Sequence, residues 1–280
     1  SVFAGGFAIE AAEAVVAGDG VEEWEVLDGI IALVDKSLVI ADEVAGGTRY
    51  RLLETIRQFG QANLAAAEAA AEYRGRHVDY YADYVLSRRP RLFGADDLAA
   101  REEVERELEN VRITLRHAAD DHATSRFDEM LDATYTVWMS RGRIMEGAAW
   151  AGEVRDRPVV DARARIVALG AAVMSLLQSD LAAALELSAV AEELAASTGA
   201  APPLMAVAGA GIVALMHGDS ETALAAHRSV VEMGPDEPDP AIRAHAYFSA
   251  IAGLGLCGDF ETVAVAHREV ETLANQLDNR

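Results

Sequence analysis

The C-terminal half of this 280-residue chain repeats itself at intervals of about 40 residues. Asp180, Asp219 and Asp259 occupy equivalent positions in the repeat, and Gly218 and Gly258 directly precede the last two. A glycine can end a helix in the left-handed conformation, and an aspartate can accept hydrogen bonds from the free amides of the next helix. The pattern therefore predicts helical hairpins, whose first helices should cover residues 166–177, 204–216 and 244–257.

A divergent earlier copy of the repeat covers residues 138–154, with Arg141, Gly142 and Arg143 at its turn. Half of the residues of the chain are apolar and only 6% are aromatic, a composition that suits helices packed closely on helices. We therefore expect residues 126–280 to form an α-α superhelix of tetratricopeptide-like repeats.

The first 65 residues show a different pattern. Apolar residues at helical spacing predict helices over 9–16 and 24–34, and a third helix should begin at residue 54. Between them, β-favouring runs at 37–41 and 48–52 flank Gly46 and Gly47, which can supply the positive φ angles of a hairpin turn. Residues 66–125 read as a helical connector. Within it, Tyr73, Tyr80, Tyr81 and Tyr84 predict an aromatic core stripe, and residues 101–116 predict one charged, solvated helix.

Four short motifs carry a family resemblance: residues 33–39, residues 50–59, Arg76-His77 before Tyr80-Tyr81, and Glu109-Asn110-Val111-Arg112. They resemble the winged-helix region of bacterial STAND-class signal-transduction ATPases, which include AfsR-like and LuxR-family transcriptional regulators. The resemblance implies a mainly α chain: a winged-helix domain with a β-hairpin wing at 1–65, a helical-bundle connector at 66–125, and the superhelix at 126–280. It also implies truncation at both ends and an upstream nucleotide-binding domain that holds ATP or ADP and docks on this chain.

Charge argues against DNA contact by this region. The net charge of the chain is −22, and the helix expected at 25–34, which would read the DNA groove, contains no basic residue. Proteins that bind DNA draw much of their affinity from basic side chains on the phosphates. Direct DNA binding by this chain is therefore disfavoured.

The sequence contains no motif typical of an enzyme or a metal site. The single lysine, Lys36, lacks the preceding glycines of a P-loop, and neither zinc-ligand spacing nor a catalytic constellation is present. We expect no enzyme activity, cofactor or metal in this chain. The lone Cys257 excludes an internal disulfide, and no apolar run is long enough for a membrane span, so the expected location is cytoplasmic. One lysine against 23 arginines is typical of a GC-rich genome such as that of an actinobacterium.

Six residues are candidates for interactions. Trp138, Arg141, Arg143 and Trp150 cluster around the first repeat turn; a packed aromatic pair with a capping arginine is favoured over an exposed site. His227 and His267 recur at equivalent repeat positions, which favours a packing role over a functional one.

Three functions remain open from the sequence. The first is a regulatory or sensor fragment of a multidomain regulator, which couples an inducer or protein on the repeats to the nucleotide-binding domain. The second is a free-standing tetratricopeptide-like scaffold that binds basic peptides, and the third is a DNA-binding winged helix. The first is preferred.

Overall fold

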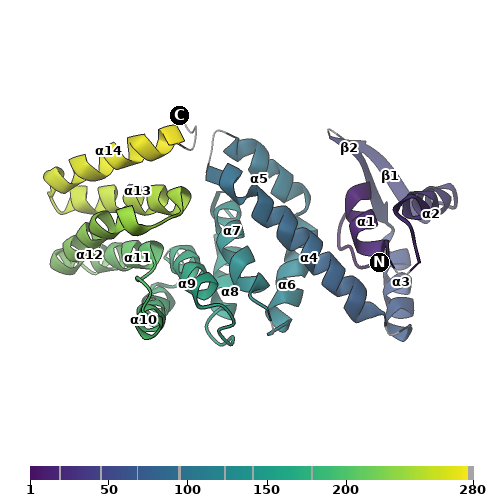
Figure 1. Ribbon diagram of the computed structural model, residues 1–280, viewed down its shortest axis with the longest axis horizontal. Coiled ribbons are helices and arrows are strands. Elements are labelled where there is room, and N and C mark those ends of the chain that lie inside the picture. Colours follow the sequence, from purple (N-terminus) through teal and green to yellow (C-terminus); the bar gives the residue numbers. More distant parts are fainter. Residues whose placement is uncertain are drawn as a thin grey trace. The chain divides into compact units, whose positions relative to one another are not determined.

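The computed structural model describes residues 1–18, 20–44, 46–67, 69–93, 96–122, 124–140, 142–177 and 179–276. The predicted fold class is confirmed: two helices and an antiparallel hairpin are followed by an array of helices (Figure 1). The chain divides into two compact units, residues 1–87 with 102–121, and residues 88–101 with 122–280.

The first unit contains the elements α1 (Ile9–Val16), α2 (Glu23–Asp35), β1 (Val39–Val44), β2 (Gly47–Leu52), α3 (Glu54–Ala66), α4 (Ala70–Arg88) up to Ser87, and α6 (Leu108–Asp120). The helix α5 (Asp97–Arg106) is divided between the units. The second unit contains η1 (Arg89–Phe93), α7 (Arg126–Ser140), α8 (Ile144–Glu153), α9 (Ala162–Leu176), α10 (Leu181–Thr198), α11 (Leu204–Met216), α12 (Ser220–Met233), η2 (Gly234–Asp236), α13 (Pro240–Leu256) and α14 (Phe260–Gln276).

The hairpin of the first unit is longer and tighter than the sequence suggested. Strand β1 continues to Val44, which pairs with Gly47, whereas residues 42–47 were expected to form the turn. Gly46 and Gly47 have φ angles of 104° and 124°, so they supply the positive φ angles that were predicted. The N-terminal segment also joins the sheet, because the backbones of Phe7 and Tyr50 exchange two hydrogen bonds of 2.9 Å.

The charged stretch at 101–116 is two helices rather than the single helix expected. Helix α5 ends at Arg106 and α6 begins at Leu108, and the intervening Glu107 is only 5% exposed. The Glu107 carboxylate forms an ion pair with Arg49 of β2 and accepts hydrogen bonds from the Tyr81 hydroxyl and the Asn110 amide. A buried polar network therefore interrupts the helix, because a carboxylate at this depth needs partners from other elements.

The same network explains two of the family motifs in physical terms. The side-chain amide of Asn110 donates to the carbonyl of Gly6 at 3.0 Å, and its oxygen accepts from the backbone N–H of Ala4 at 3.0 Å. His77 is 1% exposed, and its ring lies beside those of Phe3 and Tyr81. These motif residues hold the N-terminal segment and the hairpin against α4 and α6.

The second unit is a stack of helical hairpins. Within each pair, α7 packs on α8, α9 on α10, α11 on α12, and α13 on α14, and α9 also contacts α7 and α11 (Figure 1). The caps predicted from the repeat are present: Asp180, Asp219 and Asp259 each accept a hydrogen bond from a backbone amide three residues later. Gly218 and Gly258 have φ angles of 77° and 81°, which confirms their left-handed conformation.

One buried ion pair strengthens the first hairpins of this stack. The Nε atom of Arg165 donates to both carboxylate oxygens of Asp128 at 3.0 Å, and both side chains are at most 4% exposed. Two further guanidinium bonds go to the backbone carbonyls of Arg157 and Pro158. The buried guanidinium of Arg165 is thus paired with a carboxylate and also hydrogen-bonded to backbone carbonyls, as burial of a charge requires.

Within the described residues, no helix has both the length and the apolar character needed to span a membrane. The apolar sequence around Cys257 predicts a buried thiol, but this residue is only half-buried, because it lies at the C-terminal cap of α13. Its Sγ atom is 3.7 Å from the carbonyl of Ser220.

Candidate functional site

The tryptophan pair predicted at the first repeat turn is part of the core. Trp138 and Trp150 are 0% and 7% exposed, and the indole N–H of Trp138 donates to Thr134 at 3.2 Å. A Cβ atom on Gly147 would lie 3.1 Å from the Cβ atom of Trp138, so this glycine allows α8 to approach the tryptophan. These positions therefore serve packing.

One arginine of that turn was expected to cap a helix. Arg143 is the N-terminal cap residue of α8, but its side chain makes no capping hydrogen bond there, and Arg141 lies outside the described residues.

The two repeat histidines have different environments. His227 is 0% exposed and its ring lies between Gly211 of α11 and Gly253 of α13, where Cβ atoms would approach it to 2.6 Å and 2.1 Å. The side chain of His267 is 62% exposed and lies 3.7 Å from Glu271. His227 is therefore packed between two helices, whereas the side chain of His267 lies at the surface.

A cavity of about 380 Å³ lies among the hairpins of the second unit. Its walls come from the start of α9, the segment that connects α10 to α11, and the segment around η2 that leads into α13. Most of the lining side chains are apolar, and the complete set is Ala162, Arg163, Ile166, Val167, Thr198, Ala200, Ala201, Pro202, Pro203, Leu204, Met205, Met233, Asp236, Glu237, Pro238 and Ile242. Such a cavity is within the size range of small-molecule sites.

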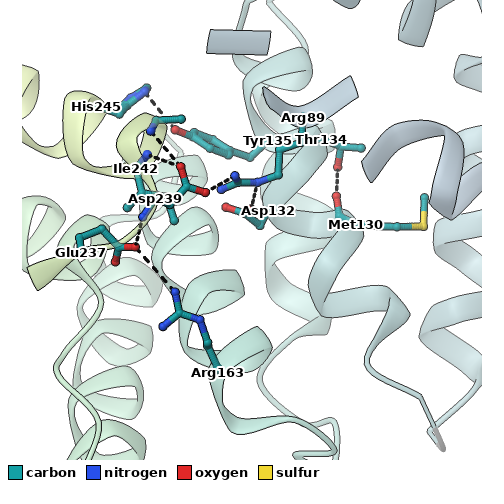
Figure 2. A network of polar contacts seen from close by, with 11 residues as sticks. Arg89, Met130, Asp132, Thr134, Tyr135, Arg163, Glu237, Asp239, Ile242 and His245 are labelled. Atoms are coloured by element: carbon teal, nitrogen blue, oxygen red, sulfur yellow. Dashed lines mark hydrogen bonds and ion pairs between the residues drawn. The ribbon is translucent and has the colours of Figure 1, made fainter. Parts of the chain in front are cut away.

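An ion pair joins two walls of this cavity. The guanidinium of Arg163 on α9 is 3.8 Å from the carboxylate of Glu237, which precedes α13 (Figure 2). The Arg163 side chain is 68% exposed, whereas that of Glu237 is only 14% exposed. Glu237 also accepts the backbone N–H of Asp239 at 3.0 Å, so its position is fixed while that of Arg163 is not.

A second polar cluster lies on the other side of Pro238. Arg89 of η1 forms ion pairs with Asp132 of α7 and Asp239, and Asp239 caps α13 by accepting from the amides of Ala241 and Ile242 (Figure 2). Burial lowers the pKa of Arg89, but the two carboxylates outweigh it, and the resulting pKa lies above the ordinary value. Arg89 therefore stays charged and ties η1 to both helices.

The cluster continues to a tyrosine and a histidine. The hydroxyl of Tyr135 lies 3.1 Å from Nδ1 of His245 (Figure 2). Burial, together with the charge of Arg101, lowers the pKa of His245, so the ring is neutral at pH 7 and Nδ1 can accept the hydroxyl proton.

The first unit presents a different surface. On α2, Trp24, Leu27 and Ile31 lie at helical spacing and are 64%, 36% and 48% exposed, while the neighbouring stripe of Val26 and Ile30 is buried in the core. The charged side chains of this helix are all acidic. We call Trp24, Leu27 and Ile31 the α2 apolar face.

Sequence reasoning missed the cavity, because its walls come from three hairpins whose residues are far apart in the chain. One signal was available: Pro202, Pro203 and Pro238, which lie in the segments between helical hairpins, line the cavity. Among the described residues, no group of three or more His, Cys, Asp or Glu side chains is placed to hold a metal ion.

Comparison with known proteins gives a partial match. No family model matches the chain. It is 33% identical over 181 residues to Mycobacterium tuberculosis and Mycobacterium bovis proteins described as "Putative HTH-type transcriptional regulator". The match covers 64% of this chain and 20% of each relative. An uncharacterized M. tuberculosis protein is 36% identical over 78 residues, 28% of this chain and 20% of its own length. The chain thus spans about a fifth of the length of these relatives, and it shares distant, partial homology with proteins described as HTH-type transcriptional regulators.

Proposed function

We propose that this chain is the regulatory part of a multidomain bacterial transcriptional regulator of the STAND class. In this proposal the tetratricopeptide-like helical array receives a ligand or protein, and the winged-helix unit docks on an upstream nucleotide-binding domain that holds ATP or ADP. The chain itself is not an enzyme and needs no cofactor. The partial match to large proteins described as transcriptional regulators supports this assignment.

The observation that carries the proposal is the α2 apolar face. A helix that reads DNA presents basic and polar side chains to the groove. Instead, α2 exposes Trp24 and Ile31 and carries only acidic charges. Burying one such side chain contributes about 1.5–3 kcal/mol, so the face suits a protein partner far better than a phosphate backbone.

The proposed partner is the domain encoded upstream in the same gene. The test is to produce that domain separately and titrate it with this chain by calorimetry in the presence of ATP or ADP. We expect binding that is weakened about tenfold or more by Trp24→Ser with Ile31→Ser. The control Met145→Ser removes an apolar side chain from α8 that is even more exposed (73%) and should leave binding unchanged.

A DNA assay completes the test. We expect no binding of a labelled duplex at about 50 mM salt, where phosphate contacts are strong. Affinity for duplex DNA that falls steeply with salt would overturn the proposal in favour of a DNA-binding winged helix. A gene without an upstream nucleotide-binding domain would overturn it in favour of a scaffold.

A further inference from the structure

We infer that the cavity between α9, α11 and α13 is a binding site for a small hydrophobic cation, a molecule with a compact apolar body and one amine group. This inference rests on the proposed function, because it names the class of ligand that the helical array would receive.

The interior of the cavity fixes the apolar part of the ligand. Ile166, Leu204, Met205 and Ile242 form its inner wall and are between 3% and 8% exposed. Leu204, Met205 and Ile242 belong to a hydrophobic core cluster of the second unit, so packing holds this wall in place. Apolar surface of this kind stabilises an apolar ligand, and a volume of about 380 Å³ limits that ligand to a small molecule.

The charges of the lining residues determine which polar group the ligand should carry. The charged lining residues are Arg163, Asp236 and Glu237, so carboxylates outnumber guanidinium groups. Asp239, two residues after Glu237, is paired with Arg89, which also pairs with Asp132. A cation therefore meets an attractive field, and the net charge of −22 on the whole chain acts in the same direction.

The exposure of the two ion-pair partners makes the preference stronger. A ligand amine can replace Arg163 beside Glu237, because the largely exposed Arg163 can turn into solvent, where water hydrates its charge. A ligand carboxylate would instead have to take Arg163 away from Glu237. That exchange would leave a carboxylate that is only 14% exposed without its cation, which is costly. The site thus favours cations over anions.

The position of the site suggests how occupancy would act on the array. Its walls belong to three successive hairpins, so a ligand contacts all of them at once. Pro238 lines this cavity and also the neighbouring one of about 370 Å³ beside Arg89. Ligand binding therefore stabilises one particular spacing of α9, α11 and α13, and differential affinity of this kind is what shifts a conformational equilibrium.

The test uses n-hexylamine as the probe, with hexan-1-ol and hexanoate as its neutral and anionic counterparts. The full chain is labelled with ¹³C at the methyl groups of isoleucine and methionine and titrated in an NMR spectrometer. We expect saturable shifts of the Ile166, Ile242 and Met205 signals with hexylamine, and affinity for hexanoate at least tenfold weaker.

A matched pair of variants tests whether the carboxylate of Glu237 binds the amine. Glu237→Gln should weaken hexylamine binding about tenfold and leave hexan-1-ol binding unchanged, whereas the control Glu192→Gln, at an exposed position on α10 outside the cavity, should change neither. The methyl spectrum of each free variant shows whether it is folded. Equal affinity for hexylamine and hexanoate, or no effect of Glu237→Gln in a folded variant, would overturn the inference.

The ligand-binding proposal and the proposed function can each fail without the other. Docking through the α2 apolar face is measured by titrating the nucleotide-binding domain with the full chain and requires no ligand at the cavity. A chain that docks on its nucleotide-binding domain but shows no methyl shifts with hexylamine refutes the ligand class alone. A chain that binds hexylamine but has no such domain to dock on refutes the proposed function alone.

Discussion

Gly253 of α13 lies directly against the imidazole ring of His227, and we predict that Gly253→Ala destabilises the second unit. A Cβ atom at this position would be 2.1 Å from Cε1 and 2.3 Å from Nδ1 of the ring. Real Cβ contacts are longer than 3.0 Å, so the ring would have to move by roughly 1 Å. It cannot move freely, because Gly211 of α11 confines it on the other side, where a Cβ atom would approach the ring to 2.6 Å.

The magnitude follows from two opposing contributions. Overpacking of this kind costs about 1–3 kcal/mol, while alanine in a helix is favoured over glycine by roughly 0.5–1 kcal/mol. We therefore expect a net loss of about 1–2 kcal/mol. Gly255→Ala is the matched control on the same helix: nothing lies within 4 Å of its Cβ position, so it should stabilise the chain by up to about 1 kcal/mol.

The assay is urea unfolding followed by tryptophan fluorescence in a Trp24→Phe background. The remaining tryptophans, Trp138 and Trp150, are both buried in the second unit, so the signal reports on that unit. In a chain that also carries His227→Ala, the cost of Gly253→Ala should disappear, because the clashing ring is gone. Equal effects of Gly253→Ala and Gly255→Ala would contradict the predicted clash. So would a destabilisation by Gly253→Ala that persists in the His227→Ala background.

Three further predictions concern stability and use urea unfolding. Burial lowers the pKa of His77 from 6.5 to about 4, so between these pH values the unfolded chain binds a proton that the folded chain does not bind. The free energy of unfolding should therefore fall as the pH drops through 6.5 toward 4, by about 2 kcal/mol more between pH 7 and pH 5 than in His77→Phe. Equal pH dependence in the two proteins would contradict this prediction. Asp180→Ala should cost about 1 kcal/mol because α10 loses its cap, whereas Asp180→Asn should cost far less; equal losses would exclude capping as the cause. Arg165→Met should cost about 3–5 kcal/mol by leaving Asp128 buried without its cation, and adding Asp128→Leu should recover most of that loss; no recovery would show that the ion pair is not the source.

Some elements were predictable because their determinants are local. The caps at Asp180, Asp219 and Asp259 depend on an aspartate, the turn before it and the next few amides. The sequence therefore identifies the cap residues themselves. The helix at 204–216 was likewise predicted with the bounds that the structure shows.

Other features were missed because distant residues determine them. The break at Glu107 depends on Arg49 and Tyr81, neither of which is near it in the sequence. Helical periodicity at 101–116 continues across the break, so no local signal marks it. The cavity is a similar case, because its inner wall combines Ile166, Met205 and Ile242 from three different hairpins.

The two histidines show a limit of reasoning from repeats. Equivalent positions predict equivalent roles only where the neighbouring helices are equivalent as well. His227 is held between Gly211 and Gly253, whereas the residue that corresponds to Gly211 in the last hairpin is Ile251. The packing role of a repeat residue therefore depends on the residues that face it, which a pattern within one repeat does not reveal.

The contact between Arg89 and Asp239 has a consequence for folding during synthesis. The two residues are 150 positions apart in the chain, and a ribosome adds roughly 5–20 residues per second. Arg89 is therefore synthesised roughly 8 to 30 s before Asp239. Residues 102–121 can meanwhile complete the first unit, whereas residues 88–101 must wait for helices that have not yet been made. The nascent chain thus passes through a stage in which this short stretch has left the ribosome without most of its final neighbours, and it is there that a chaperone or protease would find the polypeptide most accessible.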